Sequence, residues 1–230
     1  QGMGNCSEAS IKSAEATFGK VIMFEDKICD ARYSKSCGGI TENFENVWEG
    51  DPVPYLISVE DVDSKGTAFC SPDIVPEESL KSFIGNVDEK GQYFLWTFEP
   101  TQDELIRSLK NKHKIEATEI LQLTPEKIGN SGRIINLRID YKDIQNNLKS
   151  IAIHTEYEIR NIMSPSFLFS SAFSVKKNEN GNFNLIGKGW GHGVGLCQIG
   201  ALGRALNGQS TENILNHYYP VSKLKRIYSS

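Results

Sequence analysis

The sequence contains no long apolar run, no C-x-x-C pair and no basic stretch interleaved with aromatic residues. A helix that crosses a bilayer needs roughly 18 consecutive apolar residues, so we predict no membrane span. The missing C-x-x-C pair excludes zinc-ribbon and thioredoxin motifs. A formal net charge of −4 is opposite in sign to the basic patch that a polyanion requires, and we therefore expect no nucleic-acid partner.

The amino terminus lacks the features of a secretory precursor. The first residues, Gln1 to Gly4, neither begin with methionine nor lead into the apolar core of a signal peptide, and we expect a mature, trimmed or truncated chain. With 230 residues, 39% of them hydrophobic and 23% charged, the chain is long enough to bury a core and is typical of a folded globular protein. One large domain or two small lobes fit this length.

Cysteine is scarce and odd in number. The chain has five cysteines, which are Cys6, Cys29, Cys37, Cys70 and Cys197. Complete internal pairing is therefore excluded. Disulfides are typical of an oxidising envelope compartment, whereas unpaired cysteines are commonly buried. The sequence leaves both interpretations open and does not give the pairing.

Hydrophobic periodicity and turn residues predict a mixture of helices and strands. Thr101 and Glu104 have the spacing of a capping box, which favours a helix over residues 102–112. Asn180-Gly181 predicts a hairpin turn. The remaining expected helices cover residues 8–16, 156–162, 195–206 and 211–219; the expected strands cover residues 20–24, 28–33, 55–59, 93–98, 133–139, 148–153, 171–175 and 183–186; and a loop covers 61–80. These elements predict an α+β fold, largely antiparallel β with peripheral helices, and two lobes around a groove are compatible with it.

The strongest local signal lies near the carboxyl terminus. Five glycines fall within the nine residues 187–195 and alternate with other residue types, a pattern that weakens a core strand. Alternating glycines allow a backbone to lie close to a ligand, and a helix that begins near Gly195 would present free N–H groups to it. His192 is suited to proton transfer or metal binding. Trp190 is suited to stacking on a sugar face, and Gln198 offers both a donor and an acceptor.

Purely structural roles carry equal weight for this segment. The glycines would also serve tight packing, His192 would hydrogen-bond a backbone carbonyl, and Trp190 would fix the loop by packing. Two nucleotide-binding motifs are excluded, because no βαβ unit surrounds the run and because it lacks the Gly-Lys-Ser/Thr ending of a P-loop.

Three segments together resemble the stage II sporulation protein D family, which includes the amidase enhancers. Residues 189–201, GWGHGVGLCQIGA, are similar to the family signature G-W-G-H-G-V-G-x-x-Q-x-G-A. Residues 31–48 resemble a second signature, in which a strand leads to Gly-Gly-x-Thr and then to E-x-V-W, with P-Y-L at 54–56. Residues 17–22 match T-x-G-x-V-L. The resemblance covers nearly the whole chain and implies one SpoIID/LytB-like domain at 1–230 that is incomplete at its amino terminus. It is weakest around 61–130, where we expect an inserted lobe.

The resemblance implies a peptidoglycan lytic transglycosylase. Such enzymes cleave the bond between N-acetylmuramic acid and N-acetylglucosamine and leave an anhydro end, which requires an acid for the glycosidic oxygen and a base for the C6 hydroxyl. The family's glutamate for both steps lies in a helical segment before the strand at 20–24, so we expect the catalytic Glu upstream of residue 1. The Cys/His zinc site that some members carry would lie upstream as well. No residue of this chain inherits either role.

The two glycine-containing signatures are expected to supply the substrate site. We expect them to fold onto each other and to form a sugar-sized trough with His192 at its floor, where His192 would play a supporting catalytic role by orienting the sugar or the missing Glu. The expected substrate-binding residues are Tyr33, Ser34, Gly38 and Gly39 along one wall and Trp190, Gly191, Gly193 and Gln198 along the other.

A glutamate within the chain is an alternative acid. Glu42 and Glu45 follow the Gly38-Gly39 break and would lie near the trough. A solvated surface position is the favoured interpretation for both, because glutamate is almost always exposed unless it is paired.

We expect no cofactor and no metal ligand, but one zinc alternative stays open. The residue types allow a set of four ligands, made of Cys29, Cys37, Cys197 and His192. Their spacing in the sequence gives this set no support, and a local packing variation explains the two cysteines in the signatures equally well.

Three functions follow as hypotheses. In the first, the intact protein is a lytic transglycosylase of the cell envelope, periplasmic or secreted; its partner is the peptidoglycan glycan strand, and this chain supplies the substrate groove and is inactive alone. In the second, the chain is a non-catalytic wall-binding module or an activator of a cell-wall amidase. A zinc-dependent hydrolase is the third.

Overall fold

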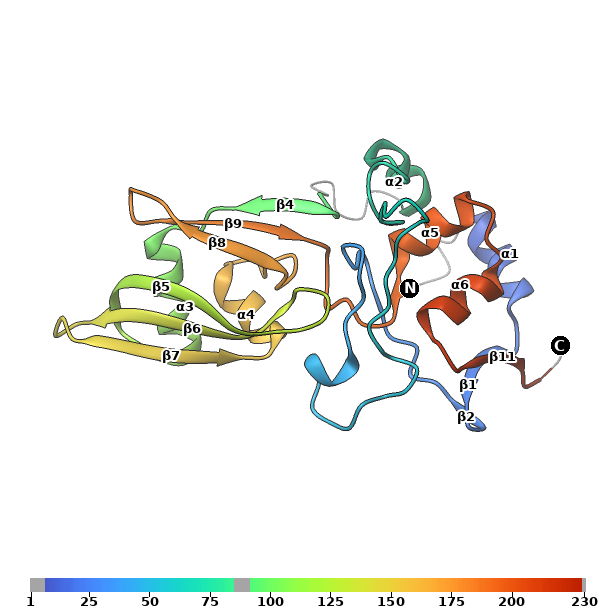
Figure 1. Cartoon of the computed structure of the whole chain (residues 1–230), viewed down its shortest axis with the longest axis horizontal. Coiled ribbons are helices and arrows are strands. Elements are labelled where there is room, and N and C mark those ends of the chain that lie inside the picture. Colours follow the sequence, from blue (N-terminus) through green and yellow to red (C-terminus); the bar gives the residue numbers. More distant parts are fainter. Residues whose placement is uncertain (1–6, 85–91, 229–230) are drawn as a thin grey trace.

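A computed structural model describes residues 7–84 and 92–228 and confirms the α+β class (Figure 1). The helices are α1 (Glu8–Ala16), α2 (Glu77–Ile84), α3 (Gln102–His113), α4 (Glu156–Met163), α5 (Gln198–Leu206) and α6 (Thr211–Tyr218), with a 3-10 turn, η2 (Phe44–Asn46). The strands are β1 (Lys20–Phe24), β2 (Lys27–Ile28), β3 (Tyr33–Ser34), β4 (Leu95–Phe98), β5 (Ala117–Ile128), β6 (Ile134–Asp143), β7 (Leu148–His154), β8 (Phe173–Lys177), β9 (Phe183–Lys188), β10 (Leu196–Cys197) and β11 (Lys223–Arg226). Among these residues, no helix is both long and apolar enough to cross a membrane.

The strands form several small sheets rather than one large one. Two three-stranded antiparallel sheets, β5-β6-β7 and β4-β9-β8, lie on one side of the molecule, and a third, β11-β1-β2, lies on the other (Figure 1). The short pair β10-β3 is parallel and sets Tyr33 beside Leu196 and Ser34 beside Cys197. This pair joins the two signature segments, which are far apart in the sequence.

The first core lies in the sheet lobe, which consists of β4 to β9 with α3 and α4 (Figure 1, left). Alternating residues of β6 face inward, and Leu137 and Ile139 are fully buried against the apolar face of α4, where Ile159 is buried as well. The Trp96 ring covers β9 so closely that a Cβ on Gly187 would lie 2.1 Å from it. The alternation therefore produces one continuous apolar layer between the sheets and helices.

The second core lies beneath α5 and α6 and contains mostly loop residues. Leu56, Val194 and Tyr218 are fully buried in it. The inserted lobe expected around 61–130 stays a prediction, because its residues are shared between the two cores: Leu80 packs in the second and Ile120 in the first.

Most predicted elements are confirmed, and the capping box is present as predicted. The Glu104 amide donates to Thr101 Oγ1 at 3.2 Å, and the Thr101 amide donates to Glu104 Oε2 at 2.9 Å. Gly181 occupies its predicted turn with φ of +84°.

Several predicted elements are wrong. The strand expected at 55–59 is a loop, because side chains replace a partner strand: Thr41 Oγ1 accepts from the Val59 amide at 2.8 Å, and Asn43 Oδ1 accepts from the Ser58 amide at 2.6 Å. The strand expected at 28–33 is interrupted between β2 and β3, and the loop expected at 61–80 runs into α2. The strands β5 and β11 were not expected, and α5 begins at Gln198 rather than near Gly195.

Candidate functional site

The glycine-histidine run is an irregular loop between β9 and β10. Its glycines at 189, 191, 193 and 195 have φ between +71° and +96°, a region that other residues rarely adopt. Packing adds a second requirement. A Cβ on Gly193 would lie 2.5 Å from the guanidinium carbon of Arg133, and one on Gly195 would lie 2.1 Å from the carbonyl oxygen of Arg32. The alternation of glycines therefore serves close packing.

The backbone amides of this loop are largely occupied within the protein. Their acceptors are Phe94 O for Gly189, Ser36 O for Trp190, Phe169 O for Gly191, His192 Nδ1 for Val194 and Arg32 O for Leu196, at 2.8–3.1 Å. At the start of α5, the Ile199 amide donates to Lys35 O and the Gly200 amide to Cys197 Sγ. The expectation that a helix terminus here offers free N–H groups to a ligand is therefore wrong for these amides.

The two glycine breaks, which are Gly38-Gly39 and the glycine-histidine run at 187–195, do meet, as expected. Ser36 forms an isolated bridge with Trp190, the Glu42 amide donates to Gly193 O at 3.0 Å, and a Cβ on Gly38 would lie 3.2 Å from the Gly189 nitrogen.

A cavity opens beside Gly38 and Gly39. Its volume is about 520 Å³, and Asp73, Phe94 and Lys188 are among the residues that line it. This volume lies within the range of small-molecule sites. His192 is not among the lining residues. The imidazole therefore does not lie at the floor of this cavity, and the expected trough around His192 stays a prediction.

A fully buried arginine forms hydrogen bonds with both glycine breaks. Arg133 donates to Gly191 O from Nε at 3.1 Å and from Nη2 at 3.0 Å, and to Cys37 O from Nη1 at 3.3 Å. The same Nη1 lies 3.0 Å from Ser131 Oγ. Burial lowers the pKa of Arg133. Neither glycine break can move without breaking contacts of this charged group.

Glu42 completes the buried network, and the prediction that it is solvated is wrong. Its side chain is 0% exposed. Oε1 accepts from the Asn43 and Asn130 amides and from Asn46 Nδ2, and Oε2 accepts from the amide and the hydroxyl of Ser131, all at 2.6–3.1 Å. Each of these contacts requires an acceptor, so the carboxylate holds loops together and is unsuited to donating a proton. Glu45 is exposed, as predicted.

His192 is half-buried and held on two sides. Its Nδ1 accepts from the Val194 amide at 3.1 Å, which places the ring proton of the neutral form on Nε2. The ring meets Trp48 edge-on, with centroids 4.8 Å apart. Burial lowers the pKa of His192 to about 4, while a hydrogen bond with the Tyr33 backbone acts in the opposite direction. Nearby positive charges that lower it further belong to Arg133, Arg160 and Arg32. His192 is therefore neutral at neutral pH.

The other predicted site residues divide into exposed and packed ones. Tyr33 is 60% exposed, and Gln198 is exposed at the start of α5. Ser34 is buried beneath Gly191. Trp190 packs against aromatic rings on both sides, with centroid distances of 4.7 Å and 5.1 Å, and these rings belong to Phe169 and Tyr93.

Two neighbours of His192 were missed as site residues. The guanidinium of Arg32 lies 4.1 Å from the centroid of Trp48, a cation–π contact. Both residues lie in the stretch that resembles the second family signature, and this resemblance is the one feature of the sequence that could have identified them as site residues. Only the fold shows that this stretch packs against His192.

The alternative zinc set of Cys29, Cys37, Cys197 and His192 is not assembled, because Cys29 and His192 lie outside the cluster that forms. Four buried side chains converge instead, and they are Cys37, Asp61, Cys70 and Cys197, whose potential ligand atoms all lie within 4.8 Å of one another. Burial raises the pKa of Cys37 and of Cys197, whereas hydrogen bonds from these two thiols lower the pKa of Cys70. The four cysteines that the structure describes are buried free thiols; Cys6 lies outside the described residues.

The network formed by residues 42, 131, 133 and 191 lies within a segment that defines a family. Residues 42–195, about two thirds of the chain, match the family model described as a domain of unknown function, DUF8618. The chain belongs to this family.

Curated relatives extend the similarity over nearly the whole chain. An uncharacterized protein of Brachyspira hyodysenteriae is 30% identical over 90% of this chain and 46% of its own length. The amidase enhancer of Bacillus subtilis is 28% identical over 93% of this chain and 32% of its own length. Stage II sporulation protein D of Bacillus amyloliquefaciens is 27% identical over 88% of this chain and 47% of its own length. These relatives confirm the resemblance to the stage II sporulation protein D and amidase-enhancer family, and the chain spans a third to a half of their length.

Proposed function

We propose that this chain is the glycan-binding part of a peptidoglycan-acting protein of the cell envelope. In this proposal the intact protein is a lytic transglycosylase that cleaves between N-acetylmuramic acid and N-acetylglucosamine, and its acid–base glutamate lies outside residues 1–230. The names of two relatives, an amidase enhancer and a stage II sporulation protein, support a role connected with the cell wall.

The observation that carries the proposal is the cavity beside Gly38 and Gly39, together with the exposed ring of Tyr33 in the same segment. Tyr33 is 60% exposed, and Gly38 and Gly39 line the cavity of about 520 Å³. An exposed aromatic ring suits the apolar face of a sugar, and Asp73 and Lys188 supply charged groups inside the cavity for hydroxyl and acetamido groups.

The proposal gives His192 and Glu42 positioning roles. His192 is neutral, and both sides of its ring contact the protein, so it holds the loop that faces the glycan rather than acting as the principal acid. Glu42 is engaged by five donors. The proposal therefore places the acid for cleavage outside residues 1–230 rather than at Glu42.

Tyr33→Ala in the intact protein tests the proposal. Tyr33 is exposed, so the substitution should leave the thermal midpoint of unfolding unchanged. It should weaken the affinity for glycan strands without stem peptides by about fivefold, which is equivalent to about 1 kcal/mol for an aromatic contact. Tyr157→Ala is the matched control, since Tyr157 is 58% exposed on α4. Equal binding by both variants would remove Tyr33 from the site, and no anhydromuramyl product from wild type would remove the transglycosylase assignment.

Activation of a cell-wall amidase is the second candidate function, favoured by the name of the Bacillus subtilis relative. It predicts that the protein binds glycan strands and accelerates an added amidase without releasing any anhydromuramyl product. The two candidates are separated by analysing the same digest for anhydro ends and for freed stem peptides.

A further inference from the structure

Three thiols and one carboxylate converge in the second core, and none of the four side chains takes part in the proposed glycan binding. They come from four separate places in the chain, and their ligand atoms lie within 4.8 Å of one another: Cys37, Asp61, Cys70 and Cys197. Cys37, Asp61 and Cys197 are 0% exposed, and Cys70 is 2% exposed. The Asp61 carboxylate is already paired with Arg204, so buried thiolates beside it would need a further cation to balance their charge.

Two of the spacings between these atoms match edges of a tetrahedron around zinc, and all of the spacings lie within 4.8 Å. Zinc binds thiolate sulfur at about 2.3 Å and carboxylate oxygen at about 2.0–2.2 Å, so the edges of a tetrahedral site measure about 3.8 Å between sulfurs and about 3.5 Å between sulfur and oxygen. In the structure, Cys37 Sγ lies 3.8 Å from Cys70 Sγ and 3.4 Å from Asp61 Oδ2. These distances match both kinds of edge.

Surrounding groups orient the carboxylate toward the Cys37 sulfur. Oδ1 of Asp61 accepts from Arg204 Nε and from the Tyr218 hydroxyl, both at 2.8 Å, and these contacts leave Oδ2 facing Cys37. His217 Nε2 lies 2.7 Å from Arg204 and fixes the guanidinium from its other side. Hydrogen bonds from outside the ligand set commonly orient metal ligands in this way.

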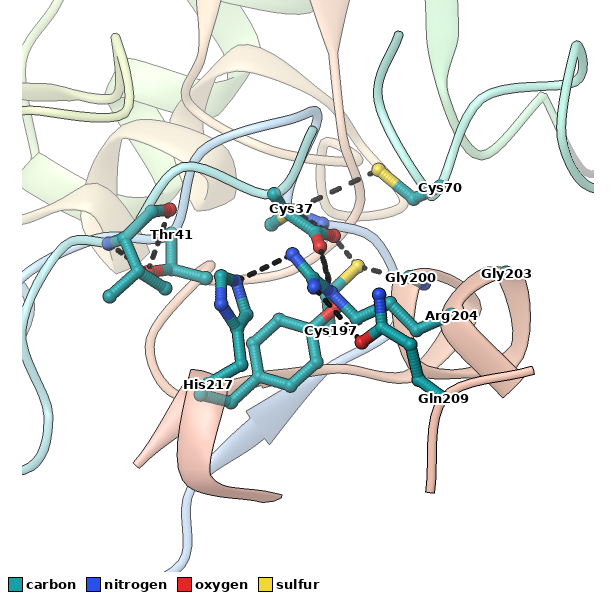
Figure 2. A network of polar contacts seen from close by, with 12 residues as sticks. Cys37, Thr41, Cys70, Cys197, Gly200, Gly203, Arg204, Gln209 and His217 are labelled. Carbon is teal, nitrogen blue, oxygen red and sulfur yellow. Dashed lines mark hydrogen bonds and ion pairs between the residues drawn. The ribbon is translucent and has the colours of Figure 1, made fainter. Parts of the chain in front are cut away.

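One sulfur is oriented by backbone amides. Cys197 Sγ accepts from the Cys37 amide at 3.1 Å and from the Gly200 amide at 3.3 Å. N–H groups directed at sulfur stabilise thiolate, which is the form that binds metal. Figure 2 shows the dashed contacts that connect Cys37, Cys70, Cys197 and Gly200.

We propose that Cys37, Asp61, Cys70 and Cys197 bind one zinc ion in a closed structural site. The ligands are three thiolates and one carboxylate, a donor set that selects zinc over magnesium or calcium. Any proton on a thiol is released when the ion binds. Four protein ligands leave no open position, so the ion stabilises the fold and performs no chemistry. Through it, the Gly38-Gly39 wall, the loop at 61–70 and the start of α5 are joined to one another.

A disulfide is the competing outcome for these thiols. It would require the sulfurs of Cys37 and Cys70 to close from 3.8 Å to about 2.05 Å. The third thiol, Cys197, and the carboxylate of Asp61 would then have no role in the cluster. A zinc site uses all four groups.

Metal analysis of the native full chain, purified with a mild reductant and without chelator, tests the proposal. We expect about one zinc per chain in wild type and at most about a tenth of that in Cys70→Ser, since three ligands do not retain a structural ion. Cys29→Ser is the matched control, because Cys29 is also a buried thiol but lies outside the cluster, and it should retain the full amount.

Cobalt substitution keeps the test decisive if Cys70→Ser does not fold. Wild type loaded with Co²⁺ should show intense thiolate-to-cobalt absorption and the visible bands of tetrahedral cobalt, and Asp61→Asn, whose side-chain oxygen can still accept from Arg204 and Tyr218, should alter the visible bands. The site would be overturned by a wild type that contains no metal and shows neither absorption with Co²⁺. A Cys37–Cys70 disulfide in the native protein, or equal zinc loss in Cys29→Ser and Cys70→Ser, would overturn it as well. None of these outcomes depends on glycan binding or cleavage.

Discussion

Replacing Glu42 with glutamine should destabilise the chain by about 3 kcal/mol. The carboxylate accepts five hydrogen bonds in a fully buried position. If the new NH₂ group takes the place of Oε2, it faces the Ser131 amide and leaves that buried N–H without an acceptor, a loss of about 1–3 kcal/mol. The remaining bonds lose the extra strength that a charged acceptor gives. In the other orientation the amides of Asn43 and Asn130 are both left without an acceptor.

Urea and thermal unfolding measure this loss. A destabilisation of about 3 kcal/mol corresponds to a decrease of about 6–12 °C in Tm for a chain of this size. Glu45→Gln is the matched control, because Glu45 is exposed, and it should stay within about 0.5 kcal/mol of wild type.

The same variant separates a structural role from a catalytic one. A Glu42→Gln protein as stable as wild type would refute the proposed structural role. If that protein also failed to cleave glycan strands, Glu42 would be the acid and no acid from outside the chain would be needed.

Three further predictions concern the loop, one histidine and a helix cap. Gly193→Ala should cost more than about 2 kcal/mol, because its Cβ would lie 2.5 Å from the Arg133 guanidinium, whereas Gly181→Ala, which has positive φ but open space around it, should cost only about 1 kcal/mol in urea unfolding. The imidazole of His192 should titrate by NMR with a pKa of about 4, below the ordinary 6.5. Because the unfolded chain binds the proton first, His192 contributes stability that is complete above pH 6.5 and is lost as the pH falls toward 4; an NMR midpoint near 6.5 would contradict this. Thr101→Ala should cost about 1 kcal/mol through loss of the capping box, and an unchanged urea midpoint would show that the cap does not contribute.

Local patterns predicted most helices and the central strands because their causes are local. The capping box at Thr101 and the Asn180-Gly181 turn act within a few residues, so they were visible in the sequence. The strand expected at 55–59 failed because the side chains of Thr41 and Asn43 take its backbone donors, and such contacts across the chain leave no periodic signal. β11 was missed for a related reason, since it exists as a partner of β1.

The candidate site was predicted in part. The juxtaposition of the two glycine breaks was correct, because both segments resemble signatures of one family. The burial of Glu42 was not foreseen, because its donors include the amides of Asn130 and Ser131, nearly 90 positions further along the chain. The thiol cluster was not predicted, and the one zinc alternative had other members, since sequence spacing does not show that Cys70 and Asp61 reach Cys37.

The sequence by itself determined the family, the fold class and the need for glycine at alternate positions of the loop. These depend on residue types and on spacing within short segments, which the sequence displays directly. Only the tertiary structure decided the protonation of His192, the structural role of Glu42 and the convergence of three thiols with Asp61. The physical reason is that desolvation, nearby charge and ligand geometry depend on which distant groups surround an atom, and folding sets those distances.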